Sequence, residues 1–220
     1  YFQAFTNTYA PVSYLEKIFT EAIQDPDVRA LSIATRPDCL GSDVLELLER
    51  LNRIKPVWVE LGLQTGHEET ARFIRRGYSL DVFDRAVADL RRLGITVIVH
   101  VILFLPGETE GRMLETVDYL NSRDIQGIKL QLLHVLEGTD LAGIYRDHPF
   151  HTPDMEEYIR VLGRCIVRLR PDIAIHRLTG DGPKDLLIAP LWTGAKRTVL
   201  NRLNQYLKEN DLWQGKEYYG

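Results

Sequence analysis

The sequence predicts an α/β fold: a partial or truncated barrel of parallel strands. Three observations lead to this prediction. Short runs rich in β-branched and aromatic residues alternate with longer segments of helical periodicity. The short runs are continuously apolar, which is typical of parallel strands covered on both faces. Polar residues gather directly after these runs, as they do at the carboxyl-terminal face of barrel enzymes.

The predicted strands are six runs: residues 1–5, 28–34, 57–63, 95–103, 127–133 and 173–176. Between them lie five predicted helices, over residues 11–24, 42–53, 80–93, 110–122 and 153–169. Strand and helix alternate throughout, and such alternation indicates one parallel sheet with right-handed crossovers. A doubly wound layer is disfavoured because no Gly-x-Gly-x-x-Gly sequence follows the early strands.

Local signals support the helices. In the first one the apolar residues recur every three or four positions and share one face: Val12, Leu15, Ile18, Phe19 and Ile23. Ser42 is the predicted N-cap of the second helix. Gly94 is the predicted glycine just after the third.

The last part of the chain breaks the repeat. Residues 178–220 contain a single helical pattern, over residues 196–207, and no further strand–helix unit. We therefore expect a barrel domain over residues 1–177 and a C-terminal helical cap over residues 178–220.

Composition restricts the classes of function. The chain has 220 residues, a net charge of −4 and two cysteines, Cys39 and Cys165. The acidic balance gives no overall attraction to nucleic acid. No apolar run approaches the roughly 20 residues of a membrane helix, so no membrane partner is expected. The sparse use of cysteine is typical of a reducing compartment, and we expect a cytoplasmic protein.

Several polar residues at strand ends are candidates for chemistry. Glu60 lies inside a predicted strand, where a carboxylate needs a partner. It could bind a ligand at the barrel mouth, or bond to a neighbouring strand or to an arginine such as Arg36. Arg76 could fork onto a carboxylate or be a solvated helix-end residue. His176 could be structural or catalytic, and Glu108 could simply lie at a helix N-terminus.

Other chemistries find no support. The scattered histidines and cysteines have no zinc spacing, so no metal site is predicted. Neither a nucleophile elbow nor a phosphate-binding P-loop sequence is present.

Six segments carry a resemblance to a known family. They are YFQAFTNTYAP (1–11), LSIATRPDCL (31–40), VWVELGLQTGHEET (57–70), ILFLPGET (102–109), KLQLLHVLEGT (129–139) and HRLTGDGP (176–183). Together they resemble the YhcC/YtqA-type radical S-adenosylmethionine (SAM) proteins. This group is related to the elongator catalytic subunit and to the oxygen-independent coproporphyrinogen oxidase. The resemblance extends over essentially the whole chain, and it implies a partial TIM-type (β/α)6 barrel.

The resemblance implies two cofactors, SAM and a [4Fe-4S] cluster, and an electron donor such as flavodoxin or ferredoxin. The family cluster is held by three cysteines in the loop after the first strand. Two cysteines cannot supply that motif. We therefore expect that the first β-loop-α unit of the barrel is missing from this chain, that the cluster ligands are absent from it, and that it is inactive alone.

The resemblance also implies binding residues, all of them SAM contacts. Thr6, Asn7 and Thr8 match the turn that binds the methionine amino group. Thr35 and Arg36 match the end of the next strand.

Further contacts follow along the chain. Glu60, Gln64 and Thr65 match the strand that touches the ribose or the methionine. Arg76 matches the arginine that pairs with the methionine carboxylate, and Glu108 lies in the turn beside the adenine.

The remaining candidates are less defined. His134 lies near the barrel centre on the fifth predicted strand and is counted with the SAM contacts. His176, Arg177 and Asp181 are typical of the family and are candidate substrate contacts.

Three functions stay open at this stage. The first is a radical enzyme, with a tRNA wobble uridine or another nucleoside as the substrate suggested by some relatives. The second is a cluster-free barrel that binds a partner. The third is an ordinary barrel lyase or isomerase that uses a carboxylate base such as Glu60. Two arginine- and lysine-rich stretches, residues 72–92 and 196–208, could contact tRNA or could be solvated helix faces.

Overall fold

A parallel sheet forms the centre of the computed structural model, which describes residues 1–3, 5–180 and 182–219. Its five strands follow the order β1-β2-β3-β4-β6 and are parallel throughout. They are β1 (Leu31–Thr35), β2 (Val57–Gln64), β3 (Thr96–Leu103), β4 (Gly127–Leu132) and β6 (Ala174–Arg177). Phe2 adds a parallel bridge to Ile33 beside β1. Five of the six predicted strands are therefore formed in the described part of the chain, and the bridge at Phe2 stands in the place of the first.

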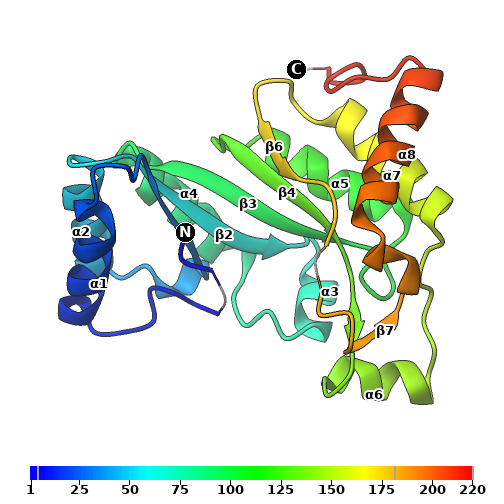
Figure 1. Ribbon diagram of the computed structural model, residues 1–220, viewed down its shortest axis with the longest axis horizontal. Coiled ribbons are helices and arrows are strands. Elements are labelled where there is room, and N and C mark those ends of the chain that lie inside the picture. The colour runs from blue at the N-terminus through cyan, green and yellow to red at the C-terminus, as the bar shows by residue number, and fades with distance from the viewer. Residues whose placement is uncertain (4, 181, 220) are drawn as a thin grey trace.

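Helices connect these strands. They are α1 (Val12–Gln24), α2 (Ser42–Asn52), α3 (Glu68–Phe73), α4 (Leu80–Arg92), α5 (Glu110–Asn121) and α7 (Met155–Arg168). A short 3-10 turn, η1 (Pro37–Cys39), follows β1. The helices cover one side of the sheet (Figure 1), where their apolar faces meet the outward side chains of the strands.

The sheet is curled into part of a barrel. The Tyr1 hydroxyl lies 3.1 Å from the Lys129 Nζ on β4, although β1, β2 and β3 separate the two in the sheet. The rings of Trp58 on β2 and His176 on β6 also meet across the concave side, 6.0 Å apart. A flat sheet would hold these pairs much farther apart, since neighbouring strands lie about 4.8 Å apart. The concave side is the lumen of the partial barrel.

Strand side chains alternate between the lumen and the helices. On β2, Val59, Leu61 and Leu63 are fully buried in the helix-covered core. Glu60 and Gly62, between them, line the lumen. Because side chains alternate along a strand, one run of residues supplies both an apolar core and a polar lumen.

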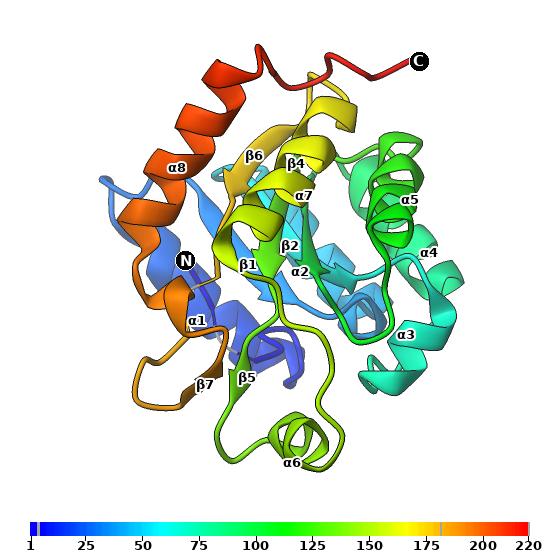
Figure 2. The same cartoon turned by 90° about the vertical axis from the view of Figure 1, so that its right-hand side faces the viewer.

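Two additions complete the fold. Helix α8 (Lys196–Glu209) packs against α7 at the outside of the barrel (Figure 1), where Arg202 pairs with Glu156 at 2.7 Å. The other addition is a small unit in which β5 (Val135–Leu136) pairs antiparallel with β7 (Leu187–Ala189), next to α6 (Asp140–Asp147). Figure 2 shows it below the main sheet. A second 3-10 turn, η2 (Leu191–Gly194), leads into α8.

The sequence predictions hold for most elements, with four differences. The first predicted strand is reduced to the single bridge at Phe2 among the described residues. Gly41, not Ser42, is the N-cap of α2. Neither α6 nor the β5–β7 pair was predicted. Gly94 does end α4 with a positive φ of 70°, as expected. The division of domains at residue 177 stays a prediction.

Candidate functional site

Two adjoining cavities open at the carboxyl ends of the strands. The first, here called the lumen cavity, has a volume of about 290 Å³ and is lined by Tyr1, Gln3, Phe5, Ala34, Thr35, Arg36, Glu60, Gly62, Gln64, Tyr78, His100, Gln131 and Arg177. The second, the mouth cavity, has a volume of about 540 Å³ and lies between the strand ends, α3 and α6. Arg36, Gln64 and Tyr78 line both and therefore mark the passage between them.

The passage depends on an unusual backbone at the end of β2. Gln64 has a φ of 67°, a left-handed conformation that non-glycine residues rarely adopt, and the pairing with β3 shifts between Gly62 and Gln64. A Cβ atom at Gly62 would lie 2.8 Å from the Gln64 Nε2 and 3.3 Å from the Tyr78 hydroxyl. Glycine at position 62 thus keeps the passage open.

Arg36 and Tyr78 form one wall of this passage. The Arg36 guanidinium donates twice to the Asp38 carboxylate, at 2.9 and 2.6 Å, and lies 5.3 Å from the centre of the Tyr78 ring. This arginine lowers the pKa of Asp38, which stays ionised. The Tyr78 hydroxyl donates to the Gly62 carbonyl, and burial raises the pKa of Tyr78 to about 12. Hydrogen bonds therefore hold both side chains of this wall in place: Asp38 holds Arg36, and the Gly62 carbonyl holds Tyr78.

We expect Gly77→Ala to destabilise the protein more than Gly94→Ala. Both glycines have positive φ, so both substitutions cost about 1 kcal/mol of backbone strain. At Gly77 the new Cβ would also lie 3.0 Å from the Arg36 Nη2, whereas at Gly94 it would meet nothing within 4 Å. Urea unfolding should show about 1 kcal/mol of additional loss for Gly77→Ala. Equal losses would mean that Arg36 moves aside freely.

At the bottom of the lumen cavity, Glu60 is the centre of a dense polar network. Its Oε2 accepts hydrogen bonds from the Tyr1 hydroxyl at 2.6 Å, the His100 Nε2 at 2.8 Å and the Lys129 Nζ at 2.5 Å. Its Oε1 accepts from the Ser32 hydroxyl at 2.9 Å. Although burial opposes ionisation, these donors together hold the pKa of Glu60 well below its usual range. Glu60 and Lys129 therefore form a buried ion pair.

The network continues from His100 to Arg177 through Gln131. The Gln131 Nε2 lies 3.3 Å from the His100 Nδ1, and the Gln131 Oε1 lies 3.5 Å from the Arg177 Nη1. Arginine can only donate, so the amide oxygen must face it and the amide nitrogen must face His100. His100 Nδ1 then accepts, and its protonated Nε2 donates to Glu60. His100 is thus a neutral imidazole in this arrangement.

Arg76 lines the mouth cavity, and each of its guanidinium nitrogens bonds to the protein. Its side chain is 1% exposed. Its guanidinium donates to the carbonyls of Leu63, Thr65 and Tyr78 and to both carboxylate oxygens of Glu68. All three guanidinium nitrogens thus have protein acceptors, and Nη2 lies 3.3 Å from each oxygen of the one Glu68 carboxylate. The contact with the methionine carboxylate that the resemblance implies stays a prediction.

In the predicted turn after the first strand, the side chains of Asn7 and Thr8 form hydrogen bonds with other parts of the protein. The Asn7 Nδ2 donates to the Ala34 carbonyl at 2.8 Å. The buried Thr8 hydroxyl bonds to the Thr35 hydroxyl at 2.5 Å and to the Cys39 carbonyl at 2.6 Å. Thr6 lies between Phe5 and Asn7 and lines neither cavity. Of the predicted contacts Thr6, Asn7, Thr8 and Thr35, only Thr35 lines the lumen cavity.

Four further predicted residues, Thr65, Glu108, His134 and His176, line neither of the two cavities. Thr65 donates to the Glu108 carboxylate at 2.5 Å, which ties the end of β2 to the turn after β3. His134 packs under the loop after β6, so that a Cβ at Gly180 would lie 2.5 Å from its ring. His176 stacks edge-on against Trp58. Asp181 lies outside the described residues.

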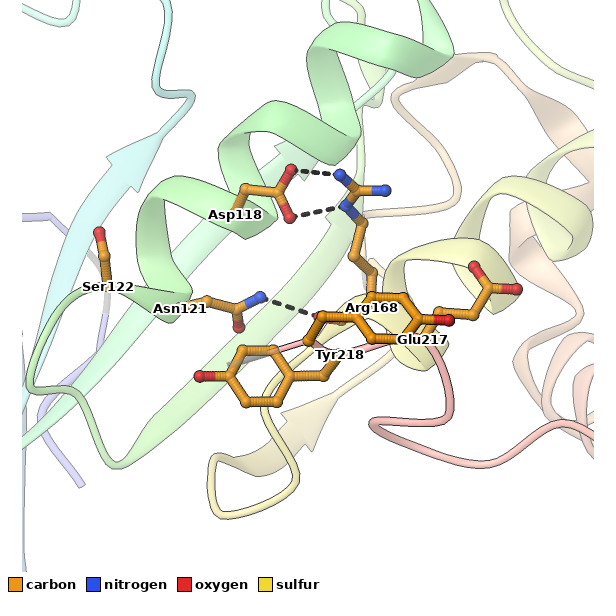
Figure 3. Close-up of a pocket in the computed structure, with 7 residues that line it drawn as sticks. Asp118, Asn121, Ser122, Arg168, Glu217 and Tyr218 are labelled. Atoms are coloured by element: carbon orange, nitrogen blue, oxygen red, sulfur yellow. Dashed lines mark hydrogen bonds and ion pairs between the residues drawn. The ribbon is translucent and has the colours of Figure 1, made fainter.

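A third cavity, of about 630 Å³, lies away from this site between the ends of α5 and α7 and the C-terminal segment. Figure 3 shows that Arg168 points toward Asp118, with which it makes two hydrogen bonds at 2.6 and 2.7 Å. The Asn121 amide donates to the Arg168 carbonyl at 2.8 Å. Polar groups that line this third cavity thus form hydrogen bonds with one another. None of the predicted site residues lines it.

The chain's cysteines do not fit an iron–sulfur cluster. Cys165 is fully buried within α7, and burial raises the pKa of its thiol to about 12, which is unfavourable for a thiolate ligand. Cys39 lies in the turn after β1, next to Asp38. Over residues 1–3, 5–180 and 182–219 no group of three metal-binding side chains occurs. The same ranges contain no helix long and apolar enough to cross a bilayer.

Comparison with known families agrees with this architecture. The profile of the Radical SAM superfamily matches residues 5–120. The chain belongs to the radical SAM superfamily. A second profile, the Radical_SAM C-terminal domain, matches residues 125–209.

Similar proteins occur in bacteria and archaea. The chain is 42% identical to Uncharacterized protein YtqA of Bacillus subtilis, over 98% of this chain and 67% of YtqA. It is 34% identical to Protein YhcC of Escherichia coli, over 96% of this chain and 69% of YhcC. Uncharacterized protein MJ0486 of Methanocaldococcus jannaschii is also 34% identical, over 100% of this chain and 69% of that protein.

Solved structures support the partial-barrel fold of the radical SAM domain. Elp3 of the archaeon Methanocaldococcus infernus, with an N-terminal deletion, aligns with a TM-score of 0.81 at 18% identity. The alignment covers 96% of this chain and 54% of that one. The coproporphyrinogen III oxidase HemN of Escherichia coli aligns with a TM-score of 0.56 at 21% identity, over 73% of this chain and 39% of that one. These likenesses establish the predicted fold class.

The residues of the candidate site that the sequence analysis did not select include Tyr78, His100, Lys129 and Gln131. A signal for three of them existed. Lys129 and Gln131 stand two positions apart on β4, and His100 stands among apolar neighbours on β3. Polar residues at alternate positions of otherwise apolar strands indicate a polar lumen. Tyr78 lies in a loop, and no pattern pointed to it.

Proposed function

We propose that the joined lumen and mouth cavities bind SAM and the molecule that reacts with it, as part of a radical SAM enzyme. One observation carries this proposal: both cavities open at the carboxyl ends of the parallel strands and share Arg36, Gln64 and Tyr78. Catalytic and ligand sites of barrel folds lie at that end. SAM would supply the adenosyl radical chemistry of the superfamily.

The residues of the mouth cavity fit the parts of SAM. Its apolar wall can enclose an adenine ring, and it is formed by Phe73, Ile74, Ile102, Leu105, Leu133, Leu141 and Ile144. Gln64 at the passage offers a side-chain amide for ribose or amino-acid groups. The volume of about 540 Å³ is within the roughly 300–1,000 Å³ of small-molecule sites.

The two cysteines of the chain do not fit a [4Fe-4S] cluster. No reaction step is therefore assigned to a cluster held by the residues of this chain. The chain spans about two thirds of YtqA and YhcC, so the activity of the whole protein is itself a proposal. An electron donor such as flavodoxin or ferredoxin stays a prediction.

The lyase alternative is poorly supported by the state of Glu60. A general base works best when its pKa lies near the working pH. Four donors hold the pKa of Glu60 well below its usual range, and its ion pair with Lys129 is buried. A carboxylate so strongly stabilised in its ionised form is a weak proton acceptor.

A tRNA substrate also stays a prediction, and the two basic stretches do not favour it. Arg75 pairs with Asp140, Arg91 with Asp124 and Arg92 with Asp89. In the second stretch Arg202 pairs with both Glu156 and Glu209. These arginines are interleaved with acids and form no uniformly basic surface.

Calorimetric titration of the chain with SAM tests the proposal. Wild type should bind, and Gly62→Val should weaken the affinity roughly tenfold or more, because its side chain enters the passage beside Gln64 and Tyr78. Gly111→Val is the matched control, since Gly111 lies exposed in α5 and away from both cavities. The proposal fails if wild type shows no binding, or if Gly62→Val binds SAM as tightly as the control.

A further inference from the structure

Among the described residues, one cation that lines the lumen cavity has no carboxylate partner. Its charged lining residues are Glu60, Arg36 and Arg177. Glu60 pairs with Lys129 at 2.5 Å, and Arg36 pairs with Asp38 at 2.6 Å. Arg177 makes no ion pair within the described part of the chain, and its one hydrogen bond is the long contact of 3.5 Å with the Gln131 amide.

The other ionisable groups around the lumen do not cancel this charge. His100 is neutral in the hydrogen-bond arrangement described above. Burial lowers the pKa of His176, and burial together with Glu60 raises the pKa of Tyr1, so both are neutral near pH 7. The charges of the described lumen residues therefore sum to a net positive charge, located on the Arg177 guanidinium.

We infer that Arg177 anchors an acidic group, a carboxylate or a phosphate, of the molecule that reacts in the lumen cavity. A guanidinium presents paired N–H donors that match such oxyanions. Arg177 stands at the end of β6 and faces the cavity, and Gln131 restrains it from β4. The inference rests on the proposed function, which places the reacting molecule beside SAM. It adds the chemical class of that molecule.

Titration with two small anions tests this anchor directly. Inorganic phosphate and acetate are added separately at constant ionic strength, and the NMR signals of the Arg177 side chain and the His100 ring are followed. We expect saturable shifts with at least one anion. Tighter binding of phosphate would indicate a phosphorylated substrate, and tighter binding of acetate a carboxylic acid. The absence of saturable shifts with both anions would overturn the inference.

Variants locate the anion. In Arg177→Gln, anion binding read at His100 should weaken roughly tenfold or more, the usual effect of losing a charged hydrogen bond. Arg177→Lys should keep part of the affinity because it keeps the charge but not the fork. Arg53→Gln, an exposed residue of the loop after α2 paired with Glu49, should bind as wild type does. Unchanged affinity in Arg177→Gln would contradict the inference.

A further arm separates the substrate from SAM. With saturating SAM present, the anion should still bind, and Arg177→Gln should keep its affinity for SAM. If the anion and SAM compete and Arg177→Gln also loses SAM affinity, Arg177 serves the methionine carboxylate and the inference is wrong. If SAM does not bind at all, the proposed function fails, while the anion titration still decides whether Arg177 is an oxyanion anchor.

Discussion

Replacement of Glu60 by leucine is expected to destabilise the fold by about 3–5 kcal/mol, the typical loss when one member of a buried ion pair is removed. The side chains of Glu60 and Lys129 are 5% and 7% exposed. Without Glu60, Lys129 would keep a buried charge with no carboxylate beside it. Tyr1, His100 and Ser32 would lose their common acceptor. Urea unfolding of wild type and variant measures the difference.

A second substitution distinguishes the charge effect from simple loss of packing. The double variant Glu60→Leu with Lys129→Met removes both charges, and it should recover about 2–3 kcal/mol relative to the sum of the single variants. Glu16→Leu is the control, because Glu16 pairs with Arg50 at the exposed surface and should cost no more than about 1 kcal/mol. Additive losses in the double variant would mean that the pair contributes no coupling.

The same pair should affect stability in acid. The folded pKa of Glu60 lies below its unfolded value, which is about 4.3. Below that pH the unfolded state binds a proton that the folded state does not, so stability falls as the pH decreases toward the folded pKa. Above it the contribution of Glu60 is fully present. Glu60→Leu should lose this part of the acid dependence, whereas Glu16→Leu should retain it.

Arg76→Ala is the second substitution with a large expected effect, a loss of about 3 kcal/mol in the free energy of unfolding. The carbonyls of Leu63 and Thr65 accept from Arg76 in the buried interior. An unsatisfied buried acceptor costs about 1–3 kcal/mol. The end of β2 would lose its link to the loop after α3, and the passage between the cavities would widen.

Two comparisons test whether stability depends on the several hydrogen bonds of the Arg76 guanidinium or only on its positive charge. Arg76→Lys should recover little, because an ammonium has three donors and cannot reach five acceptors at once. Arg75→Ala removes the neighbouring arginine, whose ion pair with Asp140 is exposed, and should change stability by less than about 0.5 kcal/mol. A stable Arg76→Ala protein that has lost only its affinity for SAM would restore the role that the resemblance suggested.

Local periodicity was sufficient to predict most of the fold. The helices α1, α2, α4, α5 and α7 lie within two residues of their predicted limits because each has one apolar face. The first strand came out shorter, since a single bridge at Phe2 is all that pairs with β1 among the described residues. The β5–β7 pair joins residues about fifty positions apart, and no local pattern encodes that pairing.

The site was only partly predictable, for a related reason. Arg36 and Gln64 stand at strand ends, and their positions alone placed them at the carboxyl-terminal face, whereas Glu60 was selected as a carboxylate inside a strand. The occupancy of Arg76 by five protein acceptors depends on how three separate segments meet, which the sequence does not specify. The strands were interpreted as continuously apolar. For that reason His100 and Lys129, at alternate positions that face the lumen, were not selected.

The Gln131 amide links His100 to Arg177 by hydrogen bonds, but it does not pass protons between them. On one side lie the Glu60 carboxylate and the His100 imidazole, which a hydrogen bond joins. On the other lies Arg177, which stays protonated at all accessible pH values. A carboxamide does not relay protons as an imidazole or a hydroxyl does, so a change of protonation at Glu60 stops at position 131. The guanidinium therefore offers a bound molecule a fixed charge and geometry, whatever the titration state of the wall beside it.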